Sequence, residues 1–102
     1  MTLDLTAAVW VVTGALFALG LAACVLRRQL LAMLLGIELM IAAANVALVH
    51  HAGLFSDAEA LAAVAIVIAV AAAEAVVGLS LILRVHRMGG GLDAGELSEL
   101  RG

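Results

Sequence analysis

The chain of 102 residues contains no proline, no tyrosine, no lysine and a single cysteine, Cys24. The lone cysteine excludes an internal disulfide and a metal centre built from cysteines. Aromatic residues make up 3% of the chain, too few for an aromatic cage or a base-stacking platform. Because the basic residues are arginines scattered along the chain, they form no basic patch, and we expect no nucleic-acid partner.

Common motifs of catalysis and cofactor binding are also missing from the sequence. It has no glycine-rich nucleotide loop, no cluster of metal-ligating side chains and no nucleophile beside a base. Two histidines that could ligate a haem inside an apolar run are absent as well. We therefore expect no redox centre, no cofactor and no metal in this chain.

Apolar residues dominate what is present. They account for 67% of the chain, charged residues for 13%, and the mean hydropathy is +1.27. Soluble domains are only about half apolar. The sequence therefore predicts an all-α integral membrane protein, a single unit over residues 1–102. The charge-poor runs predict three membrane helices, at about 5–26, 29–49 and 60–83, with no proline kink.

Arginines mark one side of the membrane. Arg27 and Arg28 follow the first predicted helix, and Arg84 and Arg87 follow the third. Neither the N-terminus nor the 50–59 connection contains arginine or lysine. The positive-inside rule then predicts an N-terminus outside and a cytoplasmic C-terminal tail. That tail, 88–102, contains three glycines at 89–91 and reads as a surface segment that docks on a partner.

The N-terminal apolar run is expected to remain as a membrane span. Residues 1–5 carry Asp4 and no basic residue, unlike the start of a signal peptide. Before the third helix, Ser56 begins a Ser-Asp-Ala-Glu stretch that ends at Glu59. This is a capping-box pattern, and it predicts Ser56 as the N-cap of that helix.

Two glutamates stand alone inside the second and third apolar runs. Glu38 comes ten residues after Arg28, and Glu74 comes ten residues before Arg84. Ten residues of helix span roughly 15 Å, which is half of a hydrocarbon core. Carboxylates at this depth are costly and usually mark an ion or proton pathway. Burial and a second carboxylate both disfavour the charged form, so a facing pair is expected to exchange protons.

Other readings of these residues stay open. Each glutamate could instead pair with a polar or basic group on a partner helix and serve assembly alone. Asn45, on the same helix face as Glu38, could hold a water in a relay or simply bridge two helices. His50 and His51 are adjacent in sequence, which makes a poor chelate, and they read as an interfacial pair. Cys24 reads as a small packing residue.

Small residues near the glutamates favour close helix packing. Ala71 and Gly78 share the face of Glu74, and two further stripes of small residues occur in the first and second helices. An alanine-rich composition would produce several such patterns by itself. The stripes are Ala32 and Gly36 in the second helix, and Gly14, Ala18 and Ala22 in the first.

Helices two and three resemble a known family. The GIELM block around Glu38 and the AAAEAVVGL block around Glu74 are similar to the K subunit of bacterial NADH:quinone oxidoreductase, respiratory complex I. The final ELSELRG is similar to that family's cytoplasmic tail. The resemblance covers nearly the whole chain. Relatives often have Asp-Gly-Gln where this chain has Asp-Ala-Glu at 57–59, and a polar asparagine where it has Ala43.

The resemblance implies a non-redox subunit in a bacterial plasma (inner) membrane. It implies a large complex in which other membrane subunits are direct partners and quinone an indirect one. NADH, FMN, iron–sulfur clusters and quinone would be bound by those partners. Glu38 and Glu74 would belong to a proton relay that couples quinone reduction to proton translocation. Arg27 and Arg28 would match the family's cytoplasmic arginines.

Three other classes of membrane protein are alternatives. The C-type subunit of a multisubunit cation/proton antiporter has a similar size and topology, but its typical pattern lacks the glutamate pair. Small proton-coupled exporters usually have four helices and an acid in the first one, which this chain does not have. Purely structural small subunits are a third alternative. The pair formed by Glu38 and Glu74 favours the respiratory complex.

Overall fold

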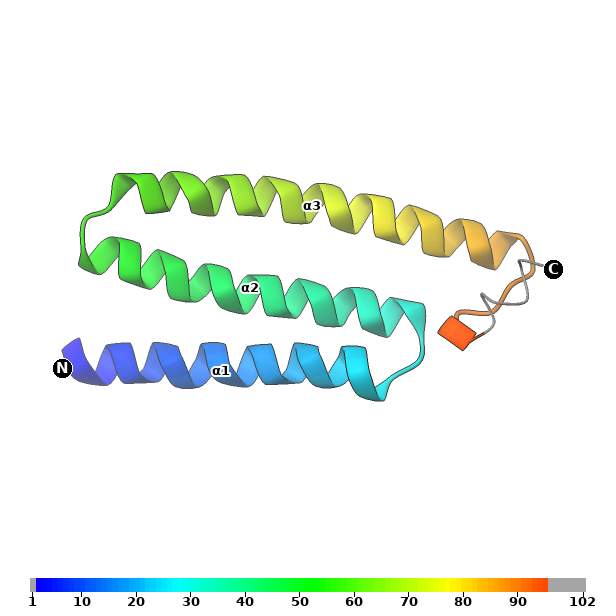
Figure 1. Ribbon diagram of the computed structural model, residues 1–102, viewed down its shortest axis with the longest axis horizontal. Coiled ribbons are helices and arrows are strands. Elements are labelled where there is room, and N and C mark those ends of the chain that lie inside the picture. Colours follow the sequence, from blue (N-terminus) through cyan, green and yellow to red (C-terminus); the bar gives the residue numbers. More distant parts are fainter. Residues whose placement is uncertain (1, 96–102) are drawn as a thin grey trace.

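A computed structural model describes residues 2–95 as three helices joined by short turns (Figure 1). The helices are α1 (Thr2–Leu26), α2 (Leu30–Leu54) and α3 (Ala58–Arg87). All three are long and apolar enough to cross a membrane, which confirms the expected all-α fold with three spans. Within the described residues there is no β-strand beyond one isolated bridge between Gln29 and Asp93.

The turn between α2 and α3 differs from the sequence prediction. Asp57, not Ser56, is the N-cap of α3, and its carboxylate accepts a hydrogen bond from the Ala60 N–H at 3.1 Å. Ser56 instead has a positive φ of 51°. The helices also extend beyond the apolar runs, α2 to Leu54 and α3 to Arg87. Backbone hydrogen bonds, which do not depend on hydropathy, set these ends.

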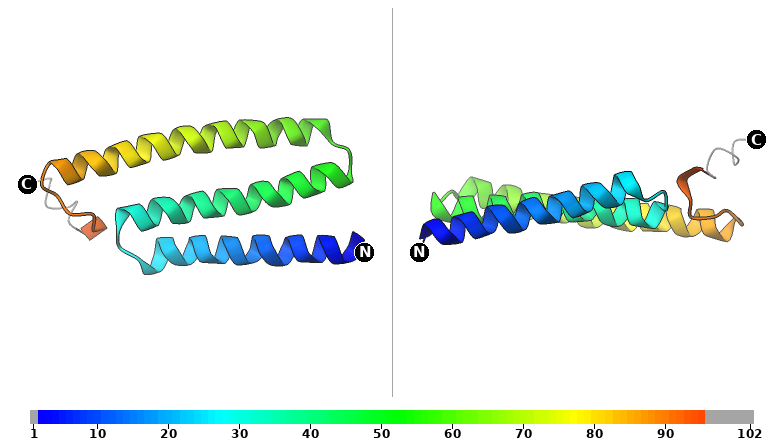
Figure 2. Two further views of the ribbon diagram at one scale, coloured as in Figure 1. Left: turned by 180° about the vertical axis from the view of Figure 1, so that it is seen from behind. Right: turned by 90° about the horizontal axis from the view of Figure 1, so that it is seen from below.

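The three helices lie side by side in a single layer (Figure 2). The molecule measures 57 × 26 × 16 Å, so its thickness is little more than that of one helix. Helix α2 lies between α1 and α3. Only Ala43, Ala52 and Val64 are buried apolar side chains among the described residues. Both faces of the layer are therefore left for lipid or for other proteins to cover.

Helices α1 and α2 are closest at a pair of glycines. A Cβ built on Gly20 would collide with the Gly36 carbonyl oxygen, and one on Gly36 would lie 2.7 Å from the Cys24 Sγ. Gly36 belongs to a predicted small-residue stripe, but Gly20 does not. Gly14, in the predicted stripe of α1, has nothing within 4 Å of an added Cβ. The tight contact is therefore made by Gly20, which is not a member of that stripe.

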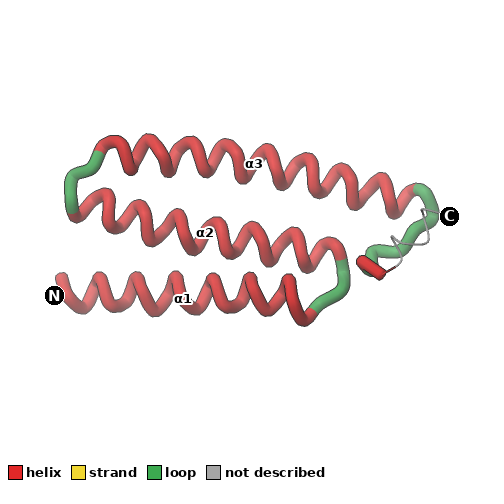
Figure 3. The backbone as a smooth tube through the Cα atoms, viewed as in Figure 1, coloured by secondary structure: helices red, strands yellow, loops and turns green. Residues whose placement is uncertain are grey.

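After α3 the chain turns back toward the α1–α2 connection (Figure 3). Gly89 adopts a positive φ of 84° at this turn. The Leu30 N–H donates to the Leu92 carbonyl at 2.6 Å, and the Ala94 N–H donates to the Arg28 carbonyl at 2.7 Å. The first part of the predicted tail is thus held against the molecule's own α1–α2 turn. Its remainder, 96–102, lies outside the described residues.

Candidate functional site: two glutamates at mid-membrane

Side-chain contacts define how α2 and α3 are aligned. Leu34 lies against Gly78, where an added Cβ would be 3.0 Å from the Leu34 Cδ1. Glu38 comes four residues after Leu34, and Glu74 comes four residues before Gly78. Because the helices are antiparallel, equal steps from the Leu34–Gly78 contact bring both glutamates to the same level. Ile41, one turn further along α2, lines a cleft together with Glu74, which agrees with this alignment.

Glu38 lies on the α3-facing side of α2. Leu34 and Ile41, which share its helix face, both lie beside α3 residues. Its side chain is half-buried, and its Oε1 atom is fully buried with no hydrogen-bond partner among residues 2–95. Buried polar oxygens are almost always hydrogen-bonded. The Glu38 Oε1 atom is therefore an exception among buried oxygens in the described part of the chain.

Glu74 occupies a different environment at the same level. Its side chain is exposed on this chain and lines a cleft of about 250 Å³. The cleft walls are otherwise aliphatic: Ile41, Ile66, Val67, Val70 and Ala71. Since α3 itself is apolar and long enough to cross a membrane, the Glu74 carboxylate would meet lipid unless another protein covers it.

The predicted supporting residue Asn45 lies in the same interhelical seam. It lines a second cleft between α2 and α3, of about 370 Å³, with Val64 and Ile68 opposite. That places it about two turns from Glu38 and toward the end of α2 remote from the arginines. The structure therefore brings Asn45 to the α2–α3 seam that also contains Glu38.

The predicted supporting residues Arg27 and Arg28 do not reach the glutamates. Both are exposed in the α1–α2 connection, about 15 Å along the axis from Glu38. The backbone carbonyl of Arg28 accepts the hydrogen bond from Ala94. Their position is compatible with contacts at the membrane surface and not with a direct ion pair to either acid.

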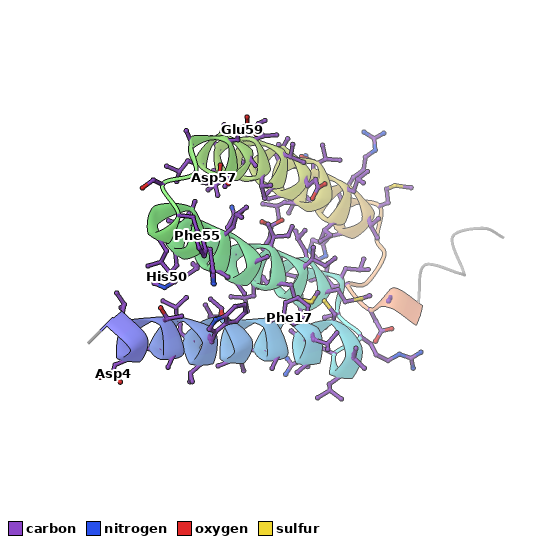
Figure 4. The ribbon with its side chains drawn as sticks, turned by 60° about the vertical axis from the view of Figure 1, so that its left-hand side comes forward. Asp4, Phe17, His50, Phe55, Asp57 and Glu59 are labelled. Carbon is purple, nitrogen blue, oxygen red and sulfur yellow. The ribbon has the colours of Figure 1, made fainter. Side chains whose placement is uncertain are left out.

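At the opposite end, His50 and His51 connect α2 to α1, which the sequence did not reveal. The Thr6 hydroxyl and the His50 Nε2 are 3.0 Å apart, and the His51 Nδ1 is 2.8 Å from the Ala47 carbonyl. The Trp10 ring meets His51 edge-on, with centroids 5.2 Å apart. Figure 4 shows His50 at the end of the molecule that also carries Asp4, Asp57 and Glu59. Thr6 and His50 belong to different helices and are 44 residues apart, and no sequence pattern predicts that they pair.

No group of three or more metal-ligating side chains occurs among residues 2–95. The described part of the chain places two carboxylates at one level of an antiparallel helix pair. Together with the three membrane-length helices, this arrangement defines a class: a multi-pass membrane protein with acidic side chains within its apolar helices.

Comparison with known families narrows this class. Residues 8–102 match the family described as NADH-ubiquinone/plastoquinone oxidoreductase chain 4L. The match covers nearly the whole chain, and the chain belongs to this family. It is therefore a membrane subunit of NADH–quinone oxidoreductase, an enzyme complex with other subunits as partners. The resemblance of the Glu38 and Glu74 blocks to that complex is confirmed at the level of the family.

Proposed function

We propose that this subunit couples quinone reduction to proton translocation through a lateral relay formed by Glu38 and Glu74. The observation that carries the proposal is their shared level at the α2–α3 seam, where the Glu38 Oε1 atom is buried without a hydrogen-bond partner among residues 2–95. Carboxyl groups at one level of a helix pair interact through their charges, so the charge of one depends on what its neighbour holds. Proton occupancy of one site then changes the free energy of the other.

The relay runs in the plane of the membrane and not across it. When two groups lie at one depth, neither is nearer than the other to either membrane surface. Exchange between them therefore moves charge sideways. Glu38 is half-buried inside this chain, whereas Glu74 is exposed in the cleft that it lines with Ile41. Charge would enter the subunit on one side of the layer and leave on the other, toward groups of neighbouring subunits.

The thin single layer supports a role inside a larger assembly. A sheet of helices 16 Å thick with three buried apolar side chains in its described part has almost no core of its own. Neighbouring membrane subunits would cover the faces and enclose Glu74 in a polar or protonatable setting. NADH, FMN, iron–sulfur clusters and quinone would be bound in those neighbours, and this chain would carry no redox centre.

Supporting roles follow from position. Asn45 would help to hydrate the seam on the side remote from the arginines. Arg27 and Arg28 would anchor the α1–α2 turn at the cytoplasmic surface, with the N-terminus outside. The membrane would be the bacterial plasma membrane.

Separate Glu38→Gln and Glu74→Gln substitutions test the relay in the assembled complex. Glutamine keeps the shape and removes the exchangeable proton. We expect each variant to assemble and to lose proton pumping by roughly tenfold or more, because a protonatable relay group is removed. Pumping and quinone reductase activity are measured in membrane vesicles. Glu59→Gln is the matched control, since Glu59 is exposed at the start of α3 and away from the seam.

Wild-type pumping by both relay variants would rule out the proposal. The rival classes are tested by purification: the chain is expected only within a large complex, and a stable isolated oligomer with drug-dependent proton uptake would favour an exporter.

A further inference from the structure

The arginine end of α3 carries a charged cleft that the relay does not use. Arg84 and Arg87 line it together with Ser80, Leu83 and Met88, and its volume is about 450 Å³. The two arginines are three residues apart, so they project from the same face of the helix. Leu83 and Met88 are 47% and 66% exposed, which gives the cleft apolar walls beside its charges.

These two guanidinium groups are not needed to finish the helix. Arginines near a helix C-terminus often bond the last carbonyl groups. Here the N–H groups of Met88, Gly89 and Gly90 donate to the carbonyls of Arg84, His86 and Val85, in that order. These backbone bonds satisfy three of the last four carbonyls of α3, so the side chains of Arg84 and Arg87 stay available for an anion.

Acidic side chains of the described chain do not neutralise the arginines. Within residues 2–95, Asp93 is the single acid at this end of the molecule. It lies at the α1–α2 turn, paired with Gln29, and its carboxylate accepts a hydrogen bond from the Gly95 N–H at 2.7 Å. The Ser80 hydroxyl donates to the Val76 carbonyl at 2.7 Å, so anion recognition depends on the two arginines.

The depth of the cleft fits a phospholipid headgroup. Arg84 and Arg87 lie about 15 and 20 Å along the helix axis from Glu74. With Glu74 at the bilayer centre, as the proposed relay requires, these distances are also the depths of the two arginines. The headgroup layer begins about 15 Å from the centre and extends to about 22 Å. Leu83 precedes Arg84 on the side toward Glu74, so it lies at the level of the first acyl carbons. Helix α3 extends past the α1–α2 turn at this end (Figure 1).

We propose that Arg84, Arg87, Leu83 and Met88 form a binding site for an anionic phospholipid in the leaflet on the arginine side. The phosphate lies between the two guanidinium groups, which suit phosphate geometry through paired N–H donors. The acyl chains lie along Leu83 and the adjacent apolar surface of α3. Zwitterionic lipid binds less well, because its ammonium or choline group opposes the arginines.

The test uses the whole complex, reconstituted into vesicles that carry a trace of a photoactivatable lipid. One preparation contains a phosphatidylglycerol probe and the other a phosphatidylcholine probe. Mass spectrometry locates the labelled residues on this chain. We expect labelling of 80–88 by the phosphatidylglycerol probe in excess over the phosphatidylcholine probe. Loss of each arginine is expected to lower it roughly fivefold, the scale of one basic residue at an anionic surface.

Three variants make the result specific. Arg84→Gln with Arg87→Gln is expected to lose labelling, whereas Arg84→Lys with Arg87→Lys retains charge and most labelling. Arg27→Gln with Arg28→Gln removes equal charge from the same membrane side and is expected to leave labelling of 80–88 unchanged. Equal labelling of the glutamine variant and wild type would overturn the proposal. So would equal labelling by both probes, or no labelling of 80–88 by either probe, as expected if another subunit covers the cleft.

Discussion

Leu34 of α2 lies directly against Gly78 of α3, with 3.0 Å between the Leu34 Cδ1 and a Cβ built on the glycine. This contact fixes the alignment of the two helices one turn away from the glutamates. Glu38 and Glu74 thereby reach the same level from opposite chain directions. The alignment of the pair therefore depends on an apolar contact, and not on a bond between the acids themselves.

Enlarging Gly78 tests this dependence. In Gly78→Ala the new methyl group meets only the end of the flexible Leu34 side chain, so we expect near-normal assembly and pumping. A Gly78→Leu substitution adds several carbons against the Leu34 side chain, and overpacking at a helix contact shifts the backbone. We expect that variant to assemble and to pump several-fold fewer protons per quinone reduced. Restoration by Leu34→Ala in the Gly78→Leu background would support the mechanism, and normal pumping by Gly78→Leu alone would contradict it.

The glycine crossing of α1 and α2 makes a second prediction. Alanine at Gly20 or Gly36 places a Cβ against the opposing backbone carbonyl, which cannot rotate away. We expect each substitution to cost about 1–3 kcal/mol and to lower the temperature at which the purified complex dissociates. Gly14→Ala is the control, because an added Cβ there has nothing within 4 Å. An equal effect of all three substitutions would show that helix propensity, and not the crossing, determines the outcome.

The polar contact between Thr6 and His50 joins α1 to α2 at the end remote from the arginines. A double-mutant cycle with Thr6→Val and His50→Leu measures it. Hydrogen bonds between membrane helices average about 0.6 kcal/mol in such cycles, and we expect a coupling of that size. The readout is the thermal midpoint of inactivation of the purified complex. Strictly additive effects of the two substitutions would mean that the contact contributes nothing.

Capping of α3 by Asp57 makes a fourth prediction. Asp57→Ala removes the acceptor for the Ala60 N–H, and loss of an N-cap costs about 1 kcal/mol. Asp57→Ser retains an acceptor and is expected to stay close to wild type, whereas Ser56→Ala is expected to change little. Thermal inactivation of the complex again gives the comparison. A larger loss in Ser56→Ala than in Asp57→Ala would restore the original capping prediction.

The sequence predicts the spans and the depth of the glutamates because both depend on composition along the chain. Glu38 and Glu74 interrupt apolar runs, and counting from Arg28 and Arg84 gives their level. It does not predict Gly20, because small residues are so frequent here that close contacts cannot be told from background.

Features that depend on backbone conformation or on the third dimension were also beyond the sequence. The N-cap of α3 is Asp57 and not Ser56, because an N-cap residue has an extended backbone and the turn gives Ser56 a positive φ. The bonds of Leu92 and Ala94 to the α1–α2 turn are made by backbone groups, which leave no trace in residue type. Glu74 is exposed because the helices lie in a flat layer, and hydropathy does not predict this arrangement.

The most direct measurement of the central claim is the infrared difference spectrum of the complex before and after quinone reduction. A relay requires that Glu38 and Glu74 change protonation or environment during turnover, and the carboxylic acid C=O stretch reports this. The account predicts a carboxylic acid difference band in the wild type that disappears or shifts in Glu38→Gln and in Glu74→Gln, and persists in Glu59→Gln. Identical spectra for the wild type and both relay variants would contradict it.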